Sequence, residues 1–166
     1  GSEMCIRDRV NNERVVLDVL HRKGWMEAPV NYGELFAVNY DGSKPQMIYG
    51  YRAGVSSFSM KASRKKTATR GWGEVIDYLP DDPEHILIKS TPMNKGGDRL
   101  AKVHKLNVYD GSLERTITRS PIPYANFITD QQSNLRAVIG VDEENIERLY
   151  RFCLLYTSPS PRDGIG

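Results

Sequence analysis

Serine and histidine are the residues of this sequence that could form a hydrolytic centre, but their pattern does not support one. Catalysis by serine needs a nucleophile on a sharp turn, as in the motif G-x-S-x-G, with a histidine base within hydrogen-bonding distance. That motif does not occur, and Ser43 and Ser112 each follow an Asp-Gly pair typical of a turn. His21, His85 and His104 are isolated from one another, and an isolated histidine is more often a structural residue than a base. We therefore assign no catalytic residue.

Acidic residues cluster in two predicted turns, at Asp81 and Asp82 and at Asp142, Glu143 and Glu144. Several such oxygens could bind a hard cation, but the spacing matches no calcium loop, and aspartate is a common turn residue. The Walker motif, the dinucleotide-binding motif G-x-G-x-x-G and the zinc motif H-E-x-x-H do not occur either. The sequence therefore predicts no metal site and no cofactor.

One basic cluster lies in segment 61–70, between Phe58 and Trp72. Its members are Lys61, Arg64, Lys65, Lys66 and Arg70. Such a loop could bind nucleic-acid phosphates, or it could face a substrate or a neighbouring domain. The whole sequence carries 23 Lys and Arg against 21 Asp and Glu, a net charge of +2, and no apolar run approaches the roughly 20 residues that span a bilayer. We therefore interpret the cluster as a solvated loop and expect neither nucleic acid nor a membrane as a partner.

The two ends of the sequence, 1–9 and 153–166, differ from the rest. Both lack the periodicity of the neighbouring segments and resemble translated adapter sequence, the alternative being natural tails. Both cysteines, Cys5 and Cys153, lie in these ends. Segment 10–152 therefore offers neither a disulfide nor a cysteine-ligated zinc site. We expect it to be a piece of a longer protein, whose compartment the sequence does not indicate.

A repeated Y-D-G-S turn is the strongest structural signal. One copy, 109–112, lies between apolar or β-branched runs at 103–108 and 113–118, and the other, 40–43, lies between 35–39 and 46–49. Asp-Gly between two such runs is typical of a β-hairpin, because glycine supplies the positive φ of the turn. The two copies predict that the chain repeats one β-unit.

Further short runs of the same kind predict strands along the chain. The expected strands are 10–20, 34–39, 46–49, 74–79, 85–90, 103–108, 113–118, 124–129, 135–140 and 147–152. The first of these also fits helical spacing, but its β-branched excess favours a strand. Segment 51–73 has no clear pattern and is expected to be a long inserted loop, with one short strand near 55–60.

Four short strands in roughly 40 to 50 residues is the period of a β-propeller blade. We predict an all-β partial β-propeller of about two and a half blades of four-stranded antiparallel sheet, at about 10–50, 74–118 and 124–152. A β-sandwich and an open β-barrel are the alternative architectures. Because blades bury their faces against neighbours, an isolated fragment is expected to be marginally stable and prone to associate.

Longer phrases of the sequence read G-E-L-F-A-V-N-Y-D-G-S (33–43), Y-G-Y-R-A-G (49–54), E-V-I-D-Y-L-P-D-D-P-E-H-I-L-I (74–88) and V-H-K-L-N-V-Y-D-G-S-L-E-R (103–115). Together they resemble the N-terminal β-propeller of bacterial prolyl oligopeptidase-family serine peptidases. The phrase F-I-T-D-Q-Q-S-N-L-R-A-V-I-G (127–140) is similar to the next blade in that family.

In that family the propeller lies over a C-terminal α/β-hydrolase domain and restricts which peptides reach a Ser-Asp-His triad. The resemblance implies a peptide-hydrolysing parent, with that hydrolase domain and a peptide substrate as partners. No motif of the triad lies in this sequence, so no catalytic residue carries over, and the chain is expected to be an inactive, substrate-gating fragment. The alternative is a TolB-like or WD-repeat-like propeller that binds a protein or a ligand.

Overall fold

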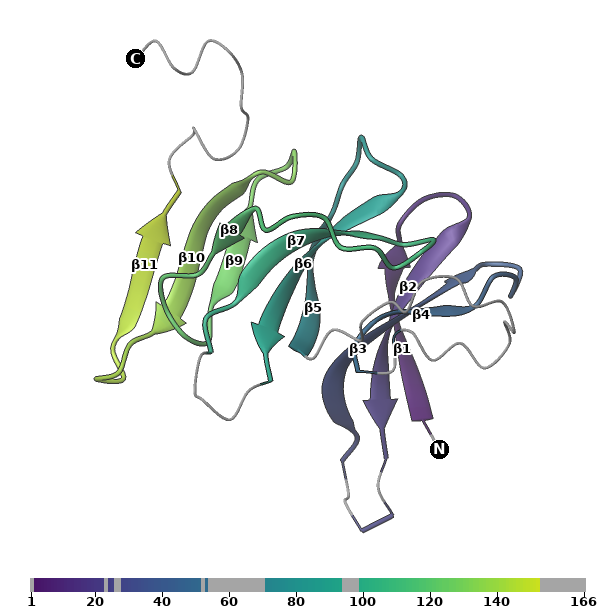
Figure 1. The fold of residues 1–166 in the computed structure, drawn as a ribbon, viewed down its shortest axis with the longest axis horizontal. Coiled ribbons are helices and arrows are strands. Elements are labelled where there is room, and N and C mark those ends of the chain that lie inside the picture. Colours follow the sequence, from purple (N-terminus) through teal and green to yellow (C-terminus); the bar gives the residue numbers. More distant parts are fainter. Residues whose placement is uncertain are drawn as a thin grey trace.

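The structure is a computed structural model that describes residues 2–22, 24–25, 28–51, 53, 71–93 and 99–152, with the backbone alone for 2–9. Within these ranges the chain forms eleven strands and no helix (Figure 1). The first sheet contains β1 (Ser2–Arg9), β2 (Arg14–His21), β3 (Val30–Asn39) and β4 (Gln46–Tyr49). The second contains β5 (Gly71–Tyr78), β6 (His85–Pro92), β7 (Lys102–Asn107) and β8 (Thr118–Arg119), and the third contains β9 (Asn126–Thr129), β10 (Leu135–Val141) and β11 (Glu147–Arg151).

All three sheets are antiparallel, and strands that are neighbours in the sequence are neighbours in the sheet. The predicted all-β fold class is confirmed, and the sheets follow one another as blades of a partial β-propeller (Figure 1). Nothing in the described ranges is a helix long and apolar enough to cross a membrane. Most of the predicted loop 51–73, including the short strand expected near 55–60 and the basic cluster, lies outside the described residues.

The first sheet has one strand more than predicted, because segment 2–9 was left outside the fold. This segment forms β1, which pairs with β2 from Ser2 opposite His21 to Arg9 opposite Val15. An open sheet edge offers backbone donors and acceptors to any extended segment, whatever side chains that segment carries. Backbone pairing of this kind leaves no hydrophobic pattern by which sequence reasoning could have found it.

Strand β5 begins at Gly71, although the prediction placed 71–73 in the loop. Gly71 and Gly73 have the composition of a loop, but here they allow two sheets to approach closely. A Cβ at position 73 would lie 2.4 Å from Cδ1 of Tyr49, and one at position 71 would lie 2.7 Å from the Tyr49 hydroxyl. Glycine in a strand often marks such an approach. The Tyr49 hydroxyl is 2.5 Å from Oγ of Ser90 in β6, and burial raises its pKa.

The Y-D-G-S turns have the geometry that the sequence predicts. Gly42 and Gly111 have φ of 82° and 70°, and in each turn an aspartate Oδ1 accepts hydrogen bonds from the backbone N and the Oγ of the serine two residues later. After the second turn the returning strand is irregular. Leu113 forms a single bridge with Leu106, and the ladder resumes only at β8.

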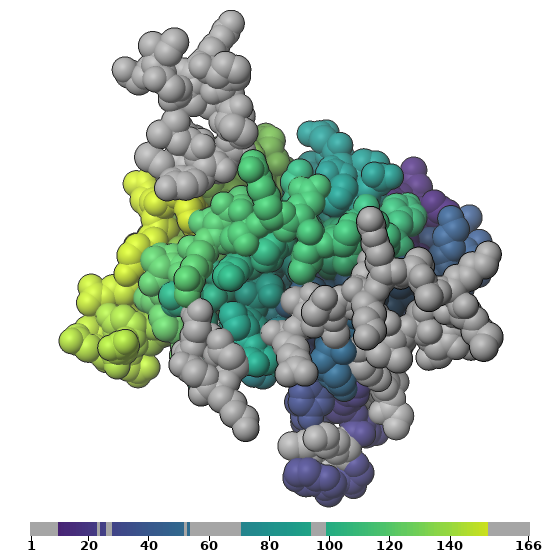
Figure 2. Space-filling model, viewed as in Figure 1, coloured from purple at the N-terminus to yellow at the C-terminus, as the bar shows by residue number. Residues whose placement is uncertain are grey.

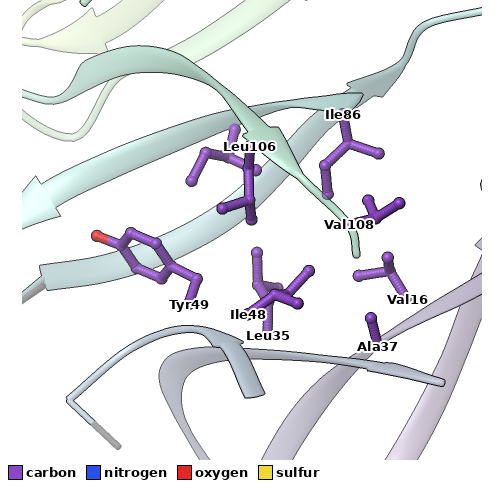
Figure 3. Close-up of a cluster of buried hydrophobic side chains, with 9 residues drawn as sticks. Val16, Leu35, Ala37, Ile48, Tyr49, Ile86, Leu106 and Val108 are labelled. Atoms are coloured by element: carbon purple, nitrogen blue, oxygen red, sulfur yellow. The ribbon is translucent and has the colours of Figure 1, made fainter. Parts of the chain in front are cut away.

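The main core fills the space between the facing surfaces of the first and second sheets (Figure 3). It consists of Val16, Leu35, Ala37, Ile48, Tyr49, Ile86, Ile88, Leu106 and Val108. Burying an aliphatic side chain of this size stabilises the fold by roughly 1.5 to 3 kcal/mol. These residues come from β2, β3, β4, β6 and β7 and from the second turn, so the two sheets are held together by apolar contacts across the whole face.

Arg14 joins the two repeated turns. Its side chain is fully buried, and its guanidinium donates to Oδ1 of Asn39 at 3.1 Å, to the carbonyl of Lys44 at 2.6 Å and to the carbonyl of Val108 at 2.8 Å. The guanidinium carbon also lies 5.2 Å from the centre of the Tyr109 ring. Burial lowers the pKa of Arg14 from its usual value. The turns that mark the repeat in the sequence are thus neighbours in space.

A second core lies between the second and third sheets. Leu87 and Val103 of the second sheet and Leu135 of the third form it, with Phe127 and Phe152 packed at its side. The rings of these two phenylalanines are stacked with centres 6.1 Å apart. Since Leu87 faces this core and Ile86 and Ile88 face the first sheet, β6 is buried on both sides, as its continuous apolar run indicates.

Candidate functional site

A groove crosses the three sheets at one end of their strands. It has a volume of about 780 Å³. The first sheet contributes residues at the start of β3, the second contributes the start of β5 and the end of β6, and the third contributes the residues that lead into β9. The lining consists of Asn31, Gly33, Trp72, Glu74, Lys89, Thr91, Pro92, Met93, Arg99, Tyr124, Ala125 and Asn126.

An ion pair lies in this groove where the second and third sheets meet. Glu74 of β5 and Lys89 of β6 are directly opposite in the strand register, and Nζ of Lys89 is 2.5 Å from Oε2 of Glu74. The same Nζ donates to the carbonyl of Ala125 at 2.8 Å. The side chain of Lys89 is 11% exposed and that of Glu74 is 59% exposed. Lys89 therefore links two sheets, and the Glu74 carboxylate is accessible to a ligand.

Two aromatic rings border the groove. Trp72 in β5 is 43% exposed and Tyr124 is 65% exposed. The guanidinium of Arg99 lies 5.7 Å from the centre of the Tyr124 ring and donates a hydrogen bond to its hydroxyl. Tyr124 has φ of 53°, a left-handed conformation that is uncommon for a bulky residue and is often found at functional sites. Both rings are thus partly exposed to solvent, and Arg99 lies over that of Tyr124.

The groove has the chemistry of a binding surface for an extended chain. Trp72 and Tyr124 offer flat apolar faces, and the amides of Asn31 and Asn126 can each donate and accept hydrogen bonds. Grooves lined by aromatic side chains are one way in which proteins bind proline-rich peptides. The contacts of these lining residues are an ion pair, a hydrogen bond between sheets and a cation–π contact, an arrangement that suits binding.

Each of the three histidines has a hydrogen-bonding partner in the structure. Nε2 of His21 lies 2.6 Å from the buried carboxylate of Glu34, and Nδ1 of His104 is 2.9 Å from the carbonyl of Glu114. His85 has two partners, because it lies between two acidic side chains.

Nδ1 of His85 is 2.9 Å from Oδ1 of Asp82, and its Nε2 is 3.5 Å from Oε1 of Glu114. Burial raises the pKa of Asp82, but hydrogen bonds from His85 and from the backbone N of Glu84 outweigh it and lower the pKa overall. Asp82 also lines a smaller cavity of about 450 Å³ between the second and third sheets. These contacts fasten the turn between β5 and β6.

Five serine hydroxyls make hydrogen bonds that stabilise turns or connect strands. Ser43 and Ser112 donate to the aspartates of their turns, which agrees with their prediction as turn residues. Ser90 contacts Tyr49, while Ser120 and Ser133 donate to the carbonyls of Ile122 and Tyr78.

Acidic residues in the hairpin turns of the third sheet are also turn residues. Oδ1 of Asp142 accepts from the backbone N of Glu144 and Ile146, and its Oδ2 accepts from Nε of Arg148 at 2.8 Å. These bonds, led by that of Arg148, lower the pKa of Asp142. Among the residues that the structure describes, no three His, Cys, Asp or Glu side chains are grouped so that they could share a metal ion.

Sequence reasoning missed most of the groove. Trp72 was noted only as a neighbour of the basic cluster, and Lys89, Arg99 and Tyr124 were not singled out. The pair of Glu74 and Lys89 had a signal, since their predicted strands 74–79 and 85–90 flank one tight turn and an antiparallel register could bring them together. Arg99 and Tyr124 lie outside the strands, and no local pattern indicates where they meet.

Comparisons with known proteins give no name to this arrangement. No protein-family model, no curated protein and no solved structure matches the chain.

Proposed function

We propose that this chain is a non-catalytic part of a substrate-gating β-propeller, belonging to a serine peptidase of the prolyl oligopeptidase type, and that its groove holds peptide. The observation that carries the proposal is the groove itself, which three consecutive sheets build at one end of their strands. Aromatic-lined grooves bind proline-rich peptides in other proteins, and Trp72 and Tyr124 provide exposed rings here. The sequence resemblance supports a peptidase of this type as the longer protein to which the chain belongs.

Tryptophan fluorescence provides a direct test, because one of the two tryptophans lies in the groove and the other does not. Trp72 lines the groove, whereas Trp25 is 80% exposed and is not part of the lining. A Trp25→Phe variant therefore reports on the groove alone, and a Trp72→Phe variant serves as its matched control. Titration with a proline-containing peptide that lacks tryptophan should change the emission of the first variant and leave that of the second unchanged.

Tyr124→Ala in the Trp25→Phe background should weaken this peptide binding by roughly tenfold, because aromatic anchors carry a large share of binding energy. Equal changes in both single-tryptophan variants, or no change in either, would contradict peptide binding in the groove. The identity of the parent has its own test. A reading frame that continues into further blades and then G-x-S-x-G supports a peptidase, and one that continues into an unrelated domain contradicts it.

A further inference from the structure

Strand β11 at the edge of the third sheet exposes side chains that are apolar and oppositely charged. All five of its residues are exposed, with Leu149 at 60% and Tyr150 at 42%. The strand pairs with β10 on one side only, and no described residue pairs with its other side. It forms the outer rim of the molecule in Figures 1 and 2, where it is coloured yellow. An exposed edge with apolar side chains is a template for pairing with another strand.

The hydrogen-bond pattern determines which backbone groups of β11 point outward. Phe152 donates its backbone N–H to the carbonyl of Arg136 in β10. In an antiparallel ladder the residues that bond one neighbour alternate with those that face away from it. Residues 150 and 148 therefore bond β10 as residue 152 does. The N–H and C=O groups of Glu147, Leu149 and Arg151 face outward.

We infer that β11 is a self-association edge that pairs antiparallel with β11 of a second copy of this chain, with Leu149 on the two-fold axis. In this register Leu149 lies opposite Leu149 of the copy, and Glu147 lies opposite Arg151 of the copy, twice by symmetry. The outward backbone groups of the two strands then face one another. Opposite charges and apolar side chains in directly opposed positions both stabilise antiparallel pairs.

Several antiparallel registers would let the outward backbone groups of the two strands face one another. Only in the register centred on Leu149 is the segment E-R-L-Y-R complementary to itself. A shift by two residues in either direction removes both Glu147 to Arg151 contacts and leaves part of the five-residue strand without a partner. A two-fold contact uses the same surface on both copies, as an isologous interface requires. The paired strands are short, so their contact is smaller than a standard stable interface and the dimer should be weak. The inference does not depend on the proposed function.

Charge exchange on the full chain tests the register. Sedimentation velocity over a range of concentrations should show a monomer–dimer equilibrium for the unmodified chain. Glu147→Arg places arginine opposite Arg151 twice and should weaken the dimer by about tenfold, and Arg151→Glu should do the same with carboxylates. The double variant Glu147→Arg with Arg151→Glu restores opposite charges and should restore the dimer.

Glu143→Arg is the matched control, because it makes the same change of charge at an exposed residue in the turn before β11 and should leave the dimer unchanged. Far-ultraviolet circular dichroism checks that each variant keeps its sheets. A chain that stays monomeric at every concentration overturns the inference. So does a dimer that all variants keep, since association then lies elsewhere, and so does a double variant that fails to recover.

Discussion

Strand β6 of the second sheet and strand β11 of the third both carry large apolar side chains, but they bury them to different extents. Ile86, Leu87 and Ile88 are at most 3% exposed, whereas Leu149 is 60% exposed. The first and third sheets cover the two faces of β6, and β11 lies at the rim of the last sheet. The difference shows that a blade is completed by its neighbours, as is general for repeat proteins.

The contact between the first and second sheets also differs from the third sheet in the interactions of its charged residues. Between the first and second sheets, Arg14 donates across sheets and is fully buried. In the third sheet the pairs are local. Arg136 lies 2.5 Å from Asp130 across one hairpin, and Arg148 lies 2.8 Å from Asp142 across the next. A buried arginine thus joins the first sheet to the second. The third sheet adds ion pairs within its own hairpins to the hydrogen bonds that join it to the second sheet through Lys89 and Ser133.

Removing the same apolar group from each region should give the largest contrast. Ile88→Ala opens a cavity between the first and second sheets and should lower the free energy of unfolding by about 3 kcal/mol. Ile128 in β9 of the third sheet is 42% exposed, and Ile128→Ala should cost about 0.5 kcal/mol. Urea unfolding followed by circular dichroism measures both values at low protein concentration. Equal losses would mean that the second sheet gains no more from its neighbours than the third.

Replacing an arginine in each region should give a smaller contrast. Arg14→Met leaves the buried carbonyl of Val108 and the part-buried carbonyl of Lys44 without their donor and should lower the free energy of unfolding by about 2 kcal/mol. Arg136→Met removes a pair whose arginine is 39% exposed and should cost less than about 1 kcal/mol. Arg14→Lys should not recover the loss, because a single ammonium cannot replace the guanidinium fork. Full recovery by lysine would show that charge alone matters at this position.

Local sequence patterns were enough to predict most strands and their order. The turn around Gly42 joins β3 and β4 as a hairpin by its backbone chemistry, and the apolar run 85–90 identifies a strand buried on both faces. The strand predicted at 113–118 was wrong in its extent, because only Leu113 and Thr118 of that range pair with β7. Strand β1 and the start of β5 were missed for different reasons. Strand β1 forms by backbone pairing with the edge strand β2. Gly71 and Gly73 lie against Tyr49, a residue that is distant in the sequence.

The candidate groove was much less predictable than the fold. Its lining comes from five separate stretches of the chain, so its chemistry exists only after the sheets stack. Arg14 shows the same limit, because a lone arginine in a strand reads as a surface residue until the two Y-D-G-S turns meet around it. Pairing inside one hairpin follows from sequence, whereas contacts between sheets depend on how the blades pack.

A pH titration tests the smallest expected effect, the contribution of the hairpin around Asp130 to the stability of the third sheet. Hydrogen bonds to Asp130, led by the backbone N–H of Asn134, lower its pKa to about 2, below the roughly 3.9 of a free aspartate. Because the pKa is lower in the folded state, the contribution to stability is fully present above about pH 4 and is lost as the pH falls toward 2. Carbon-detected NMR of the Asp130 carboxyl should give this midpoint directly.

Asp130→Asn should remove that part of the acid dependence of unfolding, while Asp81→Asn, in an exposed turn of the second sheet, should retain it. The comparison uses urea midpoints at about pH 5, above the loss, and at about pH 2.5, where much of the contribution is already lost. If Asp130 titrated near the free value, or if Asp130→Asn kept the full acid dependence, the hairpin bonds would not stabilise the third sheet. Its stability would then have to come from the contacts of Leu135 and Phe127 with the second sheet.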